Sequence, residues 1–77
     1  MKERDLAMEL INEAQRNRAM YGIAYSTVNI SEFGEGKYDL DEFKSIVSEM
    51  GYKVIPIEES HLRNTPMKNK YVVIGHN

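Results

Sequence analysis

The residues from Asp39 to Ile57 constrain the fold of this chain more than any other stretch, because they combine a capped helix, a stop signal and a strand. Asp39 has the character of an N-cap, and Glu42 completes a capping box in which two carboxylates satisfy free backbone N–H groups. Gly51 can adopt the left-handed conformation that ends a helix. Apolar side chains recur at helical spacing on one face: Leu40, Phe43, Ile46, Val47 and Met50. We therefore predict a helix whose apolar face covers a β-sheet.

The residues after Gly51 predict a buried strand at the margin of that sheet. Val54, Ile55 and Ile57 are β-branched and favour extended structure. Pro56 has no N–H to donate to a neighbouring strand, so this strand either forms a sheet edge or contains a bulge.

Three further elements complete the expected architecture. Residues 3–20 predict a first helix, with a narrow apolar stripe that includes Leu6, Leu10 and Ile11 and favours packing at the periphery or on a second subunit. Residues 23–31 and 70–76 predict strands that are apolar on both sides. The crossover helix would set the first two strands parallel. The expected fold is a single α+β domain over residues 1–77, ordered α-β-α-β-β, with two helices on one face of a three-stranded mixed sheet.

The size of the chain favours self-association. A domain of 77 residues has a thin core, and without cysteine it has no disulfide to reinforce it. Three strands would also leave two edges and one largely uncovered sheet face, so we expect a homodimer. No apolar run reaches membrane length and the first residues lack a signal-peptide core, which predicts a soluble cytoplasmic protein. The short length would also suit a phage or prophage product.

Charge is distributed unevenly along the sequence. Residues 32–59 carry eight acidic side chains against three lysines, whereas residues 61–77 carry Arg63, Lys68 and Lys70 and no acid. This asymmetry is compatible with charge complementarity within the fold or a dimer, and equally with a binding patch. The segment 58–69 is long for a hairpin loop, so it is either a recognition loop or partly an extension of the flanking strands.

Few residues suggest chemistry. Gly34 and Gly36 lack the spacing of a phosphate-binding loop, and the neighbouring acids lack the spacing of a calcium loop, so we expect neither a cofactor nor a metal. His61 is the best candidate for acid–base catalysis, next to cations that could bind phosphate. Tyrosine is enriched at interfaces. The candidate binding residues are His61, Arg63, Lys68, Lys70, Tyr25 and Tyr71.

Residues 40–77 resemble the HicA family of toxin ribonucleases. The resemblance lies in a helix followed by Gly51-Tyr52 and a strand, then Glu59-Ser60-His61, and a last strand that ends near His76. It implies a fold like that of double-stranded-RNA-binding domains and RNA cleavage with His61 as the catalytic residue. The chain departs from the family in Glu59, which replaces a glycine, and in Pro56, which interrupts the strand. The family's final helix is missing, and an extra helix and strand precede residue 40.

Two functions follow from these observations. The favoured hypothesis is a non-enzymatic accessory, regulatory or inhibitor protein that binds an unidentified protein partner as a homodimer, because no catalytic constellation is evident. The alternative is a small RNA-binding or RNA-cleaving module that uses His61 together with nearby cations.

Overall fold

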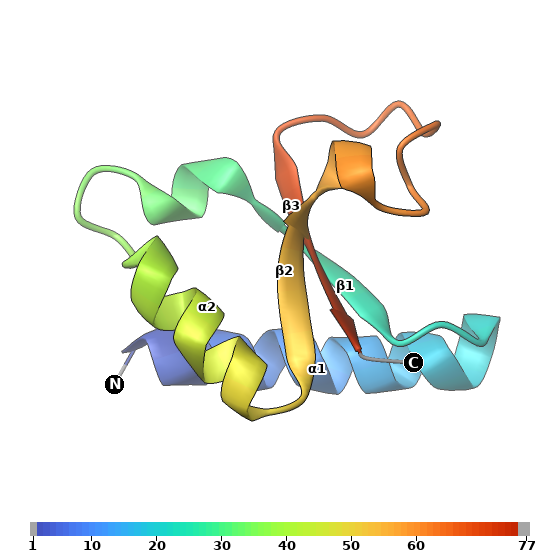
Figure 1. Cartoon of the computed structure of the whole chain (residues 1–77), viewed down its shortest axis with the longest axis horizontal. Helices are drawn as coiled ribbons and strands as arrows, with labels where there is room; N and C mark the ends of the chain where they lie inside the picture. Colours follow the sequence, from blue (N-terminus) through green and yellow to red (C-terminus); the bar gives the residue numbers. More distant parts are fainter. Residues whose placement is uncertain (1, 76–77) are drawn as a thin grey trace.

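The computed structural model describes residues 2–75 of the chain and confirms the α-β-α-β-β order. Two helices and three strands are joined by two short 3₁₀ turns (Figure 1). Their bounds are α1 (Lys2–Tyr21), β1 (Tyr25–Asn29), η1 (Ile30–Phe33), α2 (Leu40–Glu49), β2 (Tyr52–Pro56), η2 (Ile57–Glu59) and β3 (Lys70–Gly75). The strand β1 is shorter than the predicted strand 23–31, and β2 ends at Pro56 rather than Ile57, because the chain turns into η1 and η2 directly after them.

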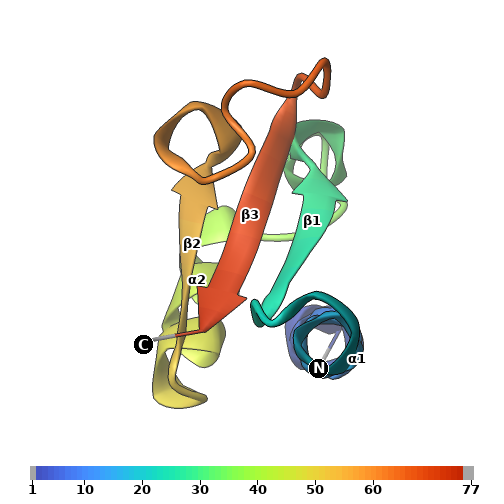
Figure 2. The ribbon, with the colours of Figure 1, turned by 90° about the vertical axis from the view of Figure 1, so that its right-hand side faces the viewer.

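The sheet is antiparallel throughout, which corrects the expected mixed sheet. Its strand order is β1-β3-β2, and β3 pairs antiparallel with both neighbours. The strands β1 and β2 do run in the same direction, as the crossover requires, but β3 lies between them (Figure 2). The central position of β3 explains why the strand is apolar on both sides: Val72 and Val73 are both fully buried.

Pro56 lies on an edge strand, as its missing N–H predicted. The Gly75 N–H donates to the Ala24 carbonyl, and the Ile30 N–H donates to the Asn69 carbonyl, both at 2.9 Å. These two bonds show which residues of β1 are hydrogen-bonded to β3. Hydrogen-bonded pairs alternate along an antiparallel ladder, so the residues of β3 that bond β2 are Val72 and Ile74. Pro56 is opposite Tyr71, which bonds β1 instead, and the proline therefore costs the sheet no hydrogen bond.

Of the two hydrogen bonds in the predicted capping box of α2, one is present and the other is replaced. Asp39 Oδ1 accepts a hydrogen bond from the Glu42 N–H at 2.9 Å. The return bond does not come from Glu42: the Asp39 N–H donates to Glu3 Oε2 of α1, also at 2.9 Å. Gly51 has φ +83°, the left-handed conformation expected after the helix. A carboxylate that is distant in sequence therefore completes the cap.

Both helices contribute to one apolar cluster with the sheet. Phe43, Ile46 and Val47 of α2 are buried, which confirms the predicted face of this helix. The helix α1 is not peripheral: Ala7 and Ala14 have no exposed surface, and Leu10 and Ile11 are nearly as buried. Small alanine side chains let the α1 backbone approach its neighbours closely, so a narrow stripe suffices to bury this helix.

The opposite face of the sheet is covered at one end only, which corrects the expected uncovered face in part. The segment from η2 to residue 69 lies over the end at which β1 and β2 finish (Figure 2), and Val72 is fully buried on that side, whereas Ile55 and Ile74 stay partly exposed. Ile57 is 2% exposed and Ser60 is 3% exposed. The Ser60 hydroxyl donates to the Ile57 carbonyl at 2.7 Å and accepts from the Leu62 N–H at 3.0 Å. The segment is therefore an ordered cover rather than an extended hairpin.

Candidate functional site

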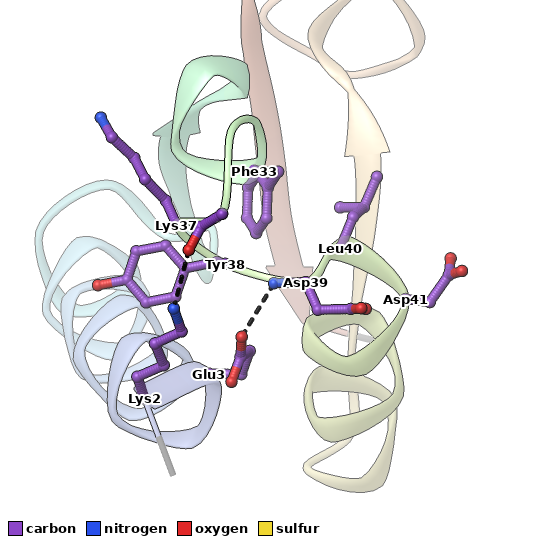
Figure 3. A pocket seen from close by; sticks show the side chains of 9 residues that line it. Lys2, Glu3, Phe33, Lys37, Tyr38, Asp39, Leu40 and Asp41 are labelled. Atoms are coloured by element: carbon purple, nitrogen blue, oxygen red, sulfur yellow. Dashed lines mark hydrogen bonds between the residues drawn. The ribbon is translucent and has the colours of Figure 1, made fainter.

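A hollow lies where the N-terminus of α1 meets the loop that leads into α2 (Figure 3). It has a volume of about 520 Å³ and is lined by Lys2, Glu3, Phe33, Gly36, Lys37, Tyr38, Asp39, Leu40 and Asp41. Lys2 Nζ donates to the Gly36 carbonyl at 3.2 Å and lies 5.7 Å from the centre of the Tyr38 ring. Glu3, which is 7% exposed, accepts the N–H of Asp39.

The contacts of this hollow are structural. The charged groups of Lys2 and Glu3 both bond backbone atoms of the segment that leads from η1 into α2, and these bonds hold α1 to that segment. The other charged side chains that line the hollow are of both signs, so the hollow does not favour a ligand of either charge. Sequence reasoning missed the role of Glu3. An acid in the first turn of a helix favours that helix by itself, so nothing in the local pattern indicated a second helix as its partner.

A second hollow, of about 350 Å³, lies between α1 and the outer edge of β1; we call it the edge groove. Leu6, Glu9, Leu10 and Glu13 line it from α1, Thr27, Val28 and Asn29 from β1, and Glu32, Tyr38 and Lys70 complete it. The edge groove does not extend to the start of β1, because Asn17 Nδ2 of α1 donates there to the Tyr25 carbonyl at 2.8 Å. The buried Ser26 hydroxyl also holds β1 to α1 through a 2.8 Å bond to the Leu10 carbonyl.

A third hollow, of about 270 Å³, lies at the far end of the sheet, where α1 passes into β1. Ile23 and Ile74 both line it. Large apolar side chains are exposed in the stretch of chain that leads from α1 to β1: Met20 is 70% exposed, Tyr21 62% and Ile23 40%. We call Met20, Tyr21 and Ile23 the helix-end patch.

The structure does not gather the predicted basic residues into one site. His61 is exposed, and its ring lies 4.9 Å from that of Tyr25 in an edge-to-face arrangement. Arg63 donates to the Ser60 carbonyl at 3.3 Å, and Lys70 Nζ donates to Asn29 Oδ1 at 2.7 Å. Lys68 is exposed, and within residues 2–75 it has no hydrogen bond or salt bridge from its side chain.

The two predicted tyrosines lie on opposite faces of the sheet. Tyr25 lies under His61, so these two predicted residues do meet. Tyr71 packs on Phe33 with ring centres 5.8 Å apart and belongs to the helix-covered side. His76 lies outside the described residues. The geometry gives His61 no hydrogen-bonding or ionic partner within residues 2–75, so nothing in it favours the RNA-cleaving alternative, which stays an untested prediction.

Comparisons with known proteins give no further assignment: no family model, no curated protein and no solved structure matches the chain. Within residues 2–75 no three side chains of histidine, aspartate or glutamate converge as a metal site would require. No helix in this part of the chain has the length and apolar character needed to cross a membrane. The two features of the surface that remain unexplained by folding are the helix-end patch and the edge groove.

Proposed function

We propose that this chain is a small non-enzymatic accessory or regulatory protein of the cytoplasm, which forms a homodimer and acts by binding another protein. The single observation that carries the proposal is the helix-end patch. Five large apolar side chains are exposed in the described chain, and Met20, Tyr21 and Ile23 fall within four consecutive residues. Isolated exposed apolar side chains are ordinary, but three within four residues at the end of a helix favour an interaction surface.

A second copy of the chain suits this patch. The patch is apolar and continues into Ile74, which shares a hollow with Ile23. An apolar surface is complementary to itself, so a two-fold axis through it would bury each copy of the patch on the other. Arg18 is the one charged side chain that lines the same hollow, and it can remain in solvent at the rim.

The size of the patch predicts a weak dimer. Burying a large apolar side chain completely contributes about 1.5–3 kcal/mol, so the exposed parts of three such side chains contribute about 3–5 kcal/mol per protomer. Two protomers together gain about 6–10 kcal/mol, which is comparable to the cost of association of about 4–15 kcal/mol. At most about 6 kcal/mol remains, so we expect a dissociation constant of about 40 μM or weaker.

A matched pair of isoleucines tests the proposal. Ile23 and Ile30 are both 40% exposed, but only Ile23 belongs to the helix-end patch. In sedimentation equilibrium over a concentration series, Ile23→Ser should weaken the dimer at least tenfold while Ile30→Ser leaves it unchanged. A wild-type chain that stays monomeric at every concentration, or an equal effect of the two substitutions, would refute the proposal.

A further inference from the structure

The outer edge of β1 has backbone groups that the fold does not use. The bonded pairs between β1 and β3 are Ala24–Gly75, Ser26–Val73 and Val28–Tyr71, so Tyr25, Thr27 and Asn29 direct their N–H and C=O groups away from the sheet. Asn17 satisfies the carbonyl of Tyr25. Within residues 2–75 no other element bonds the backbone of Thr27. An unpaired edge of this kind is a template for another strand.

The walls of the edge groove add a strong charge preference. Glu9 and Glu13 are four residues apart on α1 and therefore adjacent on one helix face, where like charges repel. Glu32 faces the same hollow from η1. Within the described chain none of these three carboxylates forms a salt bridge, although Glu13 and Glu32 are partly buried. The one cation of the groove, Lys70, bonds Asn29 instead.

We infer that the edge groove binds an extended segment of a partner protein with lysine or arginine at alternate positions, which adds to β1 as a further strand. The inference rests on the proposed partner-binding function and names the chemistry of the partner. The spacing supports it: alternate side chains of a strand are about 6.6–6.8 Å apart. Side chains at i and i+4 on a helix are about 5–6 Å apart, so two basic side chains can each reach one of Glu9 and Glu13.

Charge excludes the other occupants of an open edge. A second copy of the chain paired through β1 would bring two sets of groove carboxylates together. Nucleic acid and anionic lipid would be repelled in the same way. A basic strand, by contrast, neutralises the carboxylates while its backbone pairs with Thr27 and with the N–H of Asn29. The helix-end patch lies at the opposite end of β1, so this binding and the dimer use separate surfaces.

The test uses an acetylated eight-residue peptide of alternating lysine and valine, with a glutamate–valine peptide as control. We expect the basic peptide alone to bind at concentrations up to about 1 mM at low salt, and to slow amide exchange at Thr27 and Asn29. Glu9→Gln/Glu13→Gln should weaken binding at least tenfold. Glu58→Gln/Glu59→Gln removes the same charge from exposed positions after β2 and should change it less than twofold. Thr27→Pro, checked for folding by circular dichroism, removes the outward N–H and should also weaken binding.

Several results would overturn the inference. These are no binding of the basic peptide, equal weakening by both glutamine pairs, protection of amides elsewhere, or protection of Thr27 that rises with protein concentration in the absence of peptide. The Ile23→Ser chain separates this inference from the dimer proposal. If that variant still binds the peptide, binding by the edge groove is supported whatever the oligomeric state. If a dimeric wild-type chain does not bind the peptide, only the edge-groove inference is refuted.

Discussion

The cap of α2 provides the sharpest test of the fold, because sequence and structure assign its second hydrogen bond to different residues. A local capping box would make Glu42 the partner of the Asp39 N–H. The structure gives that role to Glu3, whose Oε2 lies 2.9 Å from the Asp39 nitrogen. Substituting each acid by alanine therefore separates a local cap from a tertiary one.

The expected cost of Glu3→Ala is about 2 kcal/mol. A hydrogen bond to a charged group contributes a net of about 1.5–3 kcal/mol, and we reduce this to about 1–2 kcal/mol because water can replace the acceptor at the exposed Asp39. Losing an acid from the first turn of α1 adds about 0.3–1 kcal/mol. Glu42→Ala removes only an exposed first-turn charge, so it should cost about 0.5 kcal/mol or less, since alanine also favours the helix.

Urea denaturation followed by circular dichroism measures both free energies of unfolding. For a domain of this size, a loss of about 2 kcal/mol corresponds to a fall in Tm of roughly 8–16 °C. Glu3→Gln keeps an acceptor oxygen without the charge and should fall between the wild type and Glu3→Ala. If Glu42→Ala proves as destabilising as Glu3→Ala, with unchanged m-values, the hydrogen bond between Glu3 and Asp39 is not what stabilises the cap.

Three further substitutions probe separate parts of the fold by the same denaturation assay. Gly51→Ala should cost about 1–2 kcal/mol, because the space around Gly51 is open but its φ of +83° is unfavourable for a residue with a Cβ; a neutral effect would contradict the left-handed stop. Val72→Ala should cost about 2–3 kcal/mol if the segment 57–69 covers the second sheet face, and far less if that face is open. His61→Ala should cost about 0.5–1 kcal/mol through the lost ring contact with Tyr25, and the effect should vanish in a Tyr25→Leu background.

Local patterns predicted the elements well because their causes are local. The N-cap at Asp39, the stop at Gly51 and the apolar face of α2 each depend on residues within one or two turns, and all three are confirmed. Pro56 likewise predicted an edge strand or a bulge from its own missing donor, and β2 is an edge strand. The candidate site was less predictable: His61 and Tyr25 do meet, but Arg63, Lys68 and Lys70 disperse because the segment 57–69 turns back on itself.

The order of the sheet could not be read from the sequence. An apolar strand at residues 70–75 is compatible with a central position or with cover by a second subunit, and only the pairing with both β1 and β2 decides for the centre. That insertion makes every pairing antiparallel. It also leaves β1 and β2 as the two edges, which is why the unused backbone groups of Thr27 come to lie beside the acidic side of α1.

The sequence by itself thus determined the helices, the strands and the cap and stop of α2, since propensity, capping and periodicity act over a few residues. Only the tertiary structure decided which carboxylate caps α2, what covers the second sheet face and where apolar side chains remain exposed. Each of these depends on contacts between residues far apart in the chain, such as Glu3 with Asp39, whose energies arise only when the elements have packed.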